Sequence, residues 1–275
     1  MDTTITTSIK ILSYNVEAQR FHRKEDVLAN GMKYYEWEYR LKLILDIIKD
    51  SEADIVCIQE VEIETFESDY KSLAAHGYGM IGHDITKEKS KKSDNDKTET
   101  TPKEKRSKRN SPIGNFVLWK TSKFKLIESA HTSCANILTL ENLATKSTFK
   151  LANVHLKAGI SNTDSIKTRI SQLQSVSEHK PDLICGDFND NFDKNVEIID
   201  KVKELGYTIH NRYLTCFTIS RDKENHYWCF DNVMTTNGRF IVRVPKCQSI
   251  SNLQLPDDSN PSDHIPLIIF AELKN

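Results

Sequence analysis

Short apolar runs constrain the fold of this chain more than any other feature of its sequence. Each run is rich in β-branched or aromatic residues, a composition and length typical of β-strands. The predicted strands lie at residues 10–16, 54–61, 77–82, 114–120, 149–156, 182–188, 227–236 and 264–273. No run approaches the roughly 18 apolar residues that a membrane-spanning helix needs, so we expect no association with a membrane.

Helical spacing of apolar residues appears between several of the predicted strands. Apolar side chains share one face over residues 34–48, 66–73, 166–176 and 196–205. Gly77 and Gly206 follow two of these stretches, where a helix C-terminus favours glycine. Strands and helices alternate early in the chain, and strands dominate later. The pattern therefore predicts an α/β fold, a two-sheet β-sandwich flanked by helices.

One segment differs from the rest in composition. Residues 86–111 contain ten Lys/Arg and five Asp/Glu, a net charge of +5, and almost no apolar side chains. Such a segment cannot bury enough surface to offset the entropy of ordering it, so we expect a disordered basic insertion. Because it lies between two predicted strands, we expect a single domain over residues 1–275. The insertion is interpreted either as a loop without function or as a basic arm that gathers RNA.

Charge and cysteine content restrict the possible functions. The whole chain carries −1, so the part outside the insertion carries −6 and is not a broadly basic nucleic-acid binder. None of the six cysteines forms a CxxC pair, which gives no sign of a zinc site. The first residues lack the charged and apolar regions of a secretory signal. We therefore expect reduced thiols and a cytoplasmic protein, with the nucleus as the other possible compartment.

Polar side chains stand at the ends of the predicted strands, where a hydrophobic core would not accept them. A single strand-end Asp is usually a turn or cap residue, and a single His is usually structural. Capping does not explain so many together, and clustered carboxylates repel one another unless a cation neutralises them. Oxygen ligands without a cysteine cluster favour Mg²⁺ or Mn²⁺. The set comprises Asn15, Glu60, His155, Asp187, Asn189, Asp231, Asp263 and His264.

These residues occur in an ordered series of motifs that resembles the endonuclease/exonuclease/phosphatase superfamily. The motifs are YN (14–15), QE (59–60), HL (155–156), GDFN (186–189), FD (230–231) and SDH (262–264). The resemblance covers about residues 9–272 and implies the four-layer, deoxyribonuclease-I-like form of the predicted sandwich. It also implies that the single domain is catalytic.

Within the superfamily, one stretch resembles the nocturnin and carbon-catabolite-repression deadenylase group. It contains VHLKAG (154–159), TRISQLQ (168–174) and ICGDFND (184–190). Two positions depart from that group. Asn232 stands where the group usually has Tyr after the Asp, and Gly159 stands near the position at which nocturnin has an Arg.

The resemblance implies hydrolysis by in-line attack of water on phosphorus, assisted by Mg²⁺ or Mn²⁺. Glu60 would hold the metal, Asn15 would assist it, and Asp263 would bind a second metal or orient the site.

The remaining motif residues would be catalytic. Asp187 would orient and deprotonate the water, and Asn189 would position the phosphate or the nucleophile. Asp231 would fix the tautomer of His264. His264 and His155 would contact the phosphate as charge builds on it.

The same resemblance implies a 3′→5′ exoribonuclease that removes poly(A) or related RNA tails and releases 5′ nucleotides. Its partner would be single-stranded RNA, which aromatic side chains usually hold by stacking. Phe217 and Trp228 are candidates for stacking, or else core aromatics. Lys157 and Arg169 are candidates for backbone phosphates, or else ordinary surface charges. We expect a monomer that other proteins recruit to transcripts.

Other functions remain open at this point. Within the superfamily, the alternatives are a nucleotide or RNA-end phosphatase, a cyclic phosphodiesterase and a DNA-repair endonuclease. The Trp and Pro-rich motifs of the inositol phosphatases are not found. A scaffold without catalysis is least expected, because the polar set would then be eroded and here it is complete.

Overall fold

The structure is a computed structural model. It describes residues 8–22, 31–84, 112–160, 162–192, 194–219, 224–236, 238–246 and 255–274. The expected disordered insertion at 86–111 lies outside these residues.

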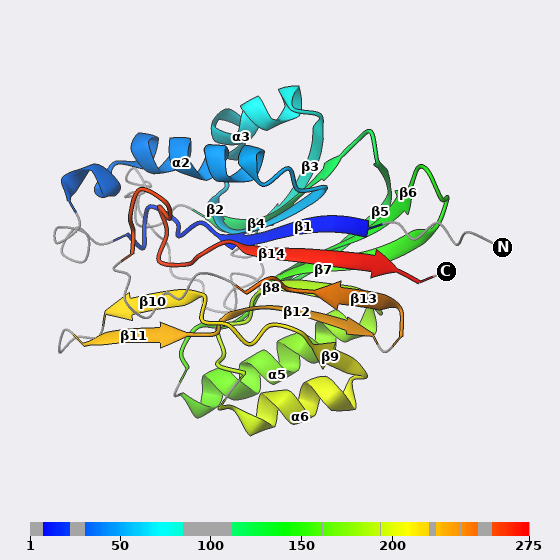
Figure 1. Ribbon diagram of the computed structural model, residues 1–275. Coiled ribbons are helices and arrows are strands. Elements are labelled where there is room, and N and C mark those ends of the chain that lie inside the picture. Colours follow the sequence, from blue (N-terminus) through cyan, green and yellow to red (C-terminus); the bar gives the residue numbers. More distant parts are fainter. Residues whose placement is uncertain are drawn as a thin grey trace, which may run out of the picture.

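Two six-stranded sheets form the centre of the molecule (Figure 1). The first sheet has the order β13 (Phe240–Arg243), β14 (Leu267–Leu273), β1 (Ser8–Asn15), β2 (Ile55–Glu62), β4 (Ile113–Lys120) and β3 (Tyr78–Asp84). The second has the order β5 (Phe124–Thr132), β6 (Ala135–Asn142), β7 (Thr148–His155), β8 (Leu183–Asp187), β12 (Asp231–Thr236) and β9 (Tyr207–Ile209). A separate hairpin pairs β10 (Cys216–Ile219) with β11 (Asn225–Trp228).

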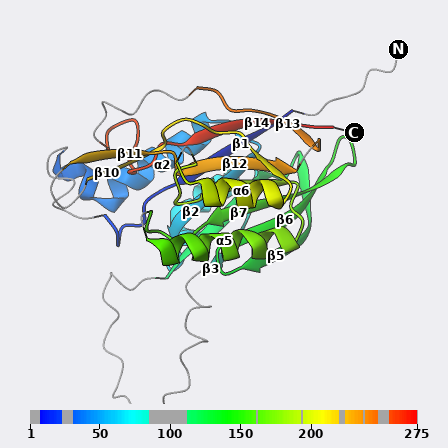
Figure 2. The same cartoon turned by 90° about the horizontal axis from the view of Figure 1, so that it is seen from below.

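Helices cover the outer face of each sheet. The 3₁₀ helix η1 (Met32–Tyr35) leads into α2 (Trp37–Asp50), which lies with α3 (Phe66–Ala75) over the first sheet. The other two, α5 (Thr163–Glu178) and α6 (Val196–Glu204), lie over the second sheet (Figure 2). The resulting order of helices, sheet, sheet and helices confirms the predicted four-layer sandwich.

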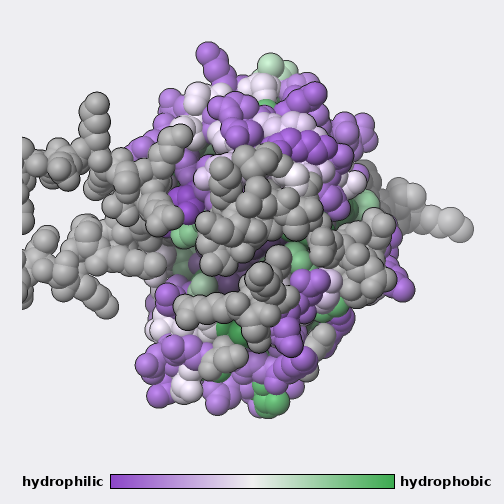
Figure 3. All heavy atoms as spheres, turned by 90° about the vertical axis from the view of Figure 1, so that its left-hand side faces the viewer, coloured by the Kyte–Doolittle hydropathy of each residue, from purple (hydrophilic) through white to green (hydrophobic). Residues whose placement is uncertain are grey.

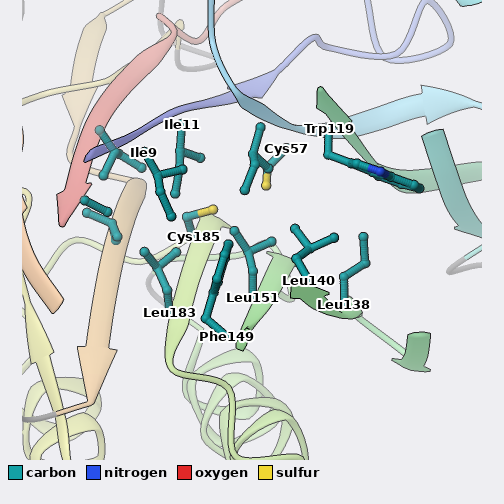
Figure 4. Packing of buried hydrophobic residues seen from close by; sticks show 14 of the residues in the cluster. Ile9, Ile11, Cys57, Trp119, Leu138, Leu140, Phe149, Leu151, Leu183 and Cys185 are labelled. Carbon is teal, nitrogen blue, oxygen red and sulfur yellow. The ribbon is translucent and has the colours of Figure 1, made fainter. Parts of the chain in front are cut away.

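The largest hydrophobic core fills the space between the two sheets (Figure 4). Inward-facing side chains of β1 and β2 meet those of β7 and β8, and Ile11, Cys57, Leu151 and Cys185 are fully buried there. Because apolar residues alternate with outward-facing ones along these strands, each sheet buries one face here and the other under its helices.

Each sheet contains one pair of parallel strands. In the first sheet, α2 connects β1 to β2, and Asn15 aligns with Gln59. In the second sheet, α5 connects β7 to β8, and His155 aligns with Asp187. Parallel strands joined by a helical crossover end at the same edge of their sheet. Both pairs therefore present their carboxyl ends at one end of the sandwich, where the polar strand ends meet.

Two features differ from the pattern expected from apolar runs. The run 227–236 forms two strands, because the chain leaves the β10–β11 hairpin at Trp228 and enters the second sheet at Asp231. Five strands, β5, β6, β9, β10 and β13, are also not predicted. Most side chains of β5 are exposed or half-buried at the edge of the second sheet, and β9, β10 and β13 have only three or four residues each. Among the described residues, no helix combines the length and apolar character required to cross a membrane.

Gly186 is required where β8 passes β7. Its φ is +141°, and a Cβ on this residue would overlap the backbone carbonyl oxygen of Val154. We expect Gly186→Ala to lower the free energy of unfolding by more than the roughly 1–3 kcal/mol that a strained backbone conformation alone costs. Urea unfolding of the variant tests this. Gly206→Ala is the matched control, because Gly206 also has a positive φ, +81°, but has open space around it. Equal losses in the two variants would show that the contact with Val154 is unimportant.

Candidate active site

A cleft of about 720 Å³ opens where the two pairs of parallel strands end. Among the residues that line it are six of the eight polar strand-end residues, namely Glu60, His155, Asp187, Asn189, Asp263 and His264. Figure 3 looks onto this end of the sandwich, where the described surface is mainly hydrophilic. Asn15 and Asp231 lie beneath the cleft and are 1% and 0% exposed. The structure therefore brings together all eight residues.

Glu60 reaches the cleft because β2 bulges at this residue. The register of β2 against β4 shifts between Ile58 and Val61, and Glu60 has a φ of +60°. A bulge of this kind re-aims the side chain of the extra residue. The carboxylate then accepts hydrogen bonds from the backbone N–H of Ala18 (3.1 Å) and from Asn15 Nδ2 (3.1 Å).

A buried polar network ties the two sheets together directly behind Glu60. Asn153 of β7 donates to the backbone oxygens of Ile58 (3.0 Å) and Phe116 (2.9 Å), which the bulge leaves available. Gln59 donates in turn to Asn153 Oδ1 (2.7 Å). Because buried polar groups are costly unless they are paired, this network favours one alignment of the sheets. It thereby fixes Glu60 of the first sheet relative to Asp187 of the second.

Asp187 lies at the centre of the site. Its Oδ2 accepts hydrogen bonds from Asn15 Nδ2 (2.9 Å) and Asn189 Nδ2 (3.2 Å), and its Oδ1 accepts one from the backbone N–H of Asn189 (2.7 Å). Asn189 adopts a φ of +50°, which asparagine tolerates better than most residues. Burial raises the pKa of Asp187, although His264 and His155 act in the opposite direction. The carboxylate is therefore held in one orientation in a poorly hydrated position.

His264 is held by a buried carboxylate. Its Nδ1 lies 2.7 Å from Asp231 Oδ2, and its backbone N–H donates to Ser262 Oγ (3.1 Å). Burial by itself lowers the pKa of this imidazole, but nearby carboxylates, Asp231 above all, outweigh burial and raise the pKa well above its usual value. Since Asp231 accepts the Nδ1 proton, Nε2 is the nitrogen that faces the cleft, 3.8 Å from Asp187 Oδ2.

Two groups of ligand atoms in the cleft are compact enough to hold a metal ion. In one, atoms of Glu60, His155 and Asp187 lie within 4.8 Å of one another. His155 Nε2 is 3.5 Å from Glu60 Oε1 and 3.7 Å from Asp187 Oδ2. In the other group, Cys216, Asp263 and His264 satisfy the same limit. Burial and the charge of Glu17 raise the pKa of Asp263 well above its usual value, so added positive charge here relieves a real repulsion.

The predicted substrate contacts do not all lie at the cleft. Lys157 is exposed on the rim, where its backbone N–H donates to Gln172 Oε1. Trp228 is partly buried and lines a neighbouring pocket of about 450 Å³. The structure contradicts a direct contact for the other two. Arg169 is fully buried in an ion pair with Asp190 (2.7 Å), and Phe217 is 2% exposed in a small apolar cluster under β10.

The two positions that depart from the deadenylase group have local structural roles. Asn232 is fully buried, and its side chain exchanges hydrogen bonds with the backbone N–H (3.0 Å) and carbonyl (3.2 Å) of Asn211. Gly159 has a φ of +109°, and its carbonyl oxygen accepts a hydrogen bond from Arg169 (3.2 Å). Neither residue lines the cleft.

Sequence reasoning missed two features of the site. Arg40 of α2 is fully buried and donates to the carbonyl oxygens of Val16 (2.7 Å), Glu17 (2.8 Å) and Pro261 (2.6 Å). It therefore joins the loop after Asn15 to the loop before Asp263. Phe21 is 46% exposed at the cleft, with the Arg20 guanidinium 4.5 Å from its ring centre. Phe21 lies shortly after the polar strand end at Asn15, whereas Arg40 lies within a predicted helix and looks like an ordinary surface charge.

Comparisons with known proteins agree with this architecture. The sequence profile of the Endonuclease/Exonuclease/phosphatase family matches residues 12–264. A curated relative, the CCR4-Not complex 3′-5′-exoribonuclease subunit Ccr4 of Candida glabrata, is 22% identical over 95% of this chain. The chain spans only 36% of that relative's length.

Two solved structures share the fold over nearly their whole length. The human Nocturnin catalytic domain with bound sulfate superposes with a TM-score of 0.68, at 21% identity, over 97% of this chain and 94% of its own. ANGEL2, a 2′,3′-cyclic phosphatase solved with adenosine-2′,3′-vanadate, gives 0.70 at 18% identity, over 98% and 97%. At these identities the likeness establishes the fold alone. The resemblance to the nocturnin and carbon-catabolite-repression group is confirmed by these relatives. With its profile match extending from Leu12 to His264, the chain belongs to the endonuclease/exonuclease/phosphatase family.

Proposed function

We propose that this protein is a Mg²⁺-dependent phosphodiesterase that shortens single-stranded RNA from the 3′ end, with poly(A) as its preferred tail. One observation carries the reaction type. Carboxylate oxygens of Glu60 and Asp187 and an imidazole nitrogen of His155 share one small volume, next to a second histidine that is oriented by a buried Asp. The exoribonuclease name of the Ccr4 relative supports the choice of RNA.

The residues present fit a magnesium ion. Glu60 and Asp187 offer hard oxygen ligands, and burial raises the pKa of Asp187, so a nearby cation would stabilise its charged form. Glu60 would hold the ion, with Asn15 orienting both carboxylates from below through bonds of 3.1 and 2.9 Å. When bound, Mg²⁺ polarises a phosphoryl oxygen and offsets the charge that builds during hydrolysis.

The protein's own groups then position the water and stabilise the phosphate. Asp187 orients the attacking water and accepts its proton, and the backbone N–H of Asn189 keeps the carboxylate aligned at 2.7 Å. His264 faces the phosphate through Nε2, while Asp231 holds the other ring nitrogen. Because the pKa of His264 is raised, its imidazole stays protonated near neutral pH. Its positive charge therefore stabilises the negative charge of the phosphate.

A row of aromatic rings supports binding of a single strand. The rings of His226 and Trp228 stack at 5.7 Å, those of Trp228 and Phe230 stack at 5.6 Å, and Phe230 lies 6.4 Å from the His264 ring. The row runs from the catalytic imidazole to the partly buried Trp228, whose Nε1 donates to Thr218 Oγ1 (2.9 Å). Bases stack on such surfaces with little dependence on sequence.

We expect Trp228→Ala to weaken RNA binding by roughly 1–3 kcal/mol, the usual contribution of one base–aromatic stack. Fluorescence anisotropy with a labelled A20 strand, in Ca²⁺ to prevent turnover, measures the change. Trp228→Phe is the control that keeps a ring and should bind within a few fold of the wild type. Unchanged affinity in Trp228→Ala would assign this residue to packing alone.

The function is tested with 5′-labelled RNA carrying an A20 or a U20 tail, in Mg²⁺ or in EDTA. We expect a ladder of shortened A-tailed products in Mg²⁺ and none in EDTA. Equal shortening of both tails would retain the exoribonuclease and remove the preference for poly(A). The same experiment includes RNA that ends in a 2′,3′-cyclic phosphate, a 5′-nucleotide and an abasic DNA duplex. Activity on one of these alone would replace RNA-tail hydrolysis with the corresponding alternative.

We also propose a reducing compartment, the cytoplasm or nucleus. All five cysteines among the described residues are buried. We further propose that the protein is a monomer and that other proteins recruit it to transcripts.

A further inference from the structure

A thiol stands next to the catalytic imidazole. Cys216, the first residue of β10, forms an isolated antiparallel bridge with His264. Residues directly opposite each other in such a bridge project their side chains to the same face. The two side chains therefore lie together at the cleft, which both residues line. Cys216 is only 1% exposed, so its side chain forms part of the cleft wall and does not project into the open space.

Asp263 completes a three-ligand group. Its Oδ1 lies 3.9 Å from His264 Nε2, and the ligand atoms of Cys216, Asp263 and His264 are all within 4.8 Å of one another. In a tetrahedral zinc site, bond lengths of about 2.0–2.3 Å place the ligand atoms roughly 3.3–3.8 Å apart. Side-chain shifts of about 1 Å or less would therefore produce that geometry.

The surroundings of the group favour a metal with an open coordination position. Asp231 accepts the Nδ1 proton of His264 at 2.7 Å, which is the carboxylate–histidine arrangement that orients a metal-binding imidazole and leaves Nε2 as the ligand. The backbone on both sides is fixed, because the N–H of Phe217 donates to the Asp263 carbonyl (2.8 Å) and that of Ile265 donates to the Thr215 carbonyl (2.8 Å). The cleft supplies space for water as a fourth ligand.

The donor types separate this group from the proposed magnesium site. Glu60 and Asp187 offer oxygen, which suits Mg²⁺, whereas Cys216 adds a soft sulfur that Mg²⁺ does not use. Sulfur, imidazole and carboxylate together suit Zn²⁺ and its spectroscopic substitute Co²⁺. The spacing of the cysteines along the chain gave no sign of this, because β10 and the loop before β14 bring the ligands together only in the folded protein.

We propose that Cys216, Asp263 and His264 form a binding site for a thiophilic divalent cation, Zn²⁺ above all, and that its occupation inhibits the enzyme. Binding releases the thiol proton and any proton on His264 Nε2, because both atoms must offer a lone pair to the metal. The imidazole nitrogen that would face the phosphate is then occupied. The inhibitory effect rests on the proposed function, whereas metal binding does not.

The first test reads the metal directly and needs no substrate. Purified protein is titrated with Co²⁺ in the presence of excess Mg²⁺, and its absorption spectrum is recorded. A cobalt–thiolate bond gives a charge-transfer band in the near ultraviolet, which we expect in the wild type and in the Glu60→Gln variant. We expect no band in Cys216→Ser. Cys134→Ser is the matched control, because it removes another fully buried thiol that belongs to neither ligand group, and it should retain the band.

The second test measures inhibition of RNA hydrolysis by Zn²⁺ at a fixed excess of Mg²⁺. Without Zn²⁺, Cys216→Ser should match the wild type within a few fold. Its sensitivity to Zn²⁺ should fall by at least the roughly 10–100-fold that loss of a ligand's hydrogen-bond partner typically costs. Circular dichroism and a thermal melt of each variant establish that it is folded.

The two tests separate failure of this inference from failure of the proposed function. Absence of the thiolate band in folded wild-type protein, or its persistence in Cys216→Ser, would overturn the metal site. Equal inhibition of wild type and Cys216→Ser would show that Zn²⁺ acts at Glu60 and Asp187 instead. A thiolate band in a protein that hydrolyses no RNA would retain the site and reject the substrate.

Discussion

Replacement of Glu60 by glutamine is expected to lower kcat/KM for RNA hydrolysis by roughly 100–1,000-fold, the usual loss when one key electrostatic group is removed. Glutamine keeps the shape of the side chain and its bond to the backbone N–H of Ala18, but it loses the charge that would hold Mg²⁺. The protein should remain folded, because Glu60 lies among Asp187 and Asp263 and its charge adds to their repulsion. Single-turnover assays with labelled RNA, together with a thermal melt, measure both effects.

Glu62→Gln is the matched control. Glu62 lies two residues further along β2, is half-buried and accepts a hydrogen bond from the backbone N–H of Arg20 (3.1 Å), but it belongs to neither group of metal-ligand atoms. We expect its activity to stay within a few fold of the wild type. Glu60→Ala should behave like Glu60→Gln. Near-wild-type hydrolysis by folded Glu60→Gln protein in Mg²⁺ would reject the proposed metal site.

Replacement of Arg169 by alanine is expected to destabilise the protein by about 3–5 kcal/mol, because it leaves a buried carboxylate without its partner. Arg169 of α5 donates to Asp190 Oδ2 (2.7 Å) and to the carbonyl oxygens of Lys157 (2.9 Å) and Gly159 (3.2 Å). Burial raises the pKa of Asp190 in spite of this guanidinium, so the lone carboxylate would be still less favourable. Urea unfolding followed by circular dichroism measures the loss.

A second variant distinguishes this structural role from the predicted contact with RNA. In Arg169→Met combined with Asp190→Leu, no charge is left unpaired, and apolar replacements of buried ion pairs are often tolerated. We expect part of the lost stability to return, although the carbonyl oxygens of Lys157 and Gly159 still lack their donor. RNA affinity, measured below the unfolding transition, should match the wild type. Loss of affinity in this folded variant would restore the role in substrate binding.

The sequence was sufficient for the layers of the fold and for the eight polar residues that the structure brings together at the cleft. Buried strands such as β2 and β8 are nearly continuous apolar runs, so a polar residue at the end of one is conspicuous. Glu60 and Asp187 are both found in this way. The C-terminal limits of α3 and α6 were also readable, because Gly77 and Gly206 follow these helices and have φ values of +80° and +81°.

Burial of long side chains could not be predicted, because it depends on contacts between distant segments. Arg169 looks like a surface charge on a polar helix, yet its partner Asp190 arrives from the turn after β8. Phe217 belongs to a short hairpin, and it is covered by Leu255 and Ile265 from much later in the chain. The bulge that turns Glu60 into the cleft likewise leaves no trace in the apolar pattern. It depends on how β2 pairs with β4.

The pairing of β1 with β14 brings two segments that are far apart in the sequence together at the site. Ser13 of β1 aligns with Leu267 of β14. During synthesis, Asn15 emerges from the ribosome some 250 residues before Asp263 and His264. A growing chain that already has Glu60, His155 and Asp187 still lacks its second histidine and the strand that closes the first sheet. If the proposed nuclease activity holds, its site cannot form, and the messenger and ribosomal RNA nearby cannot be attacked, before synthesis of this domain is almost complete.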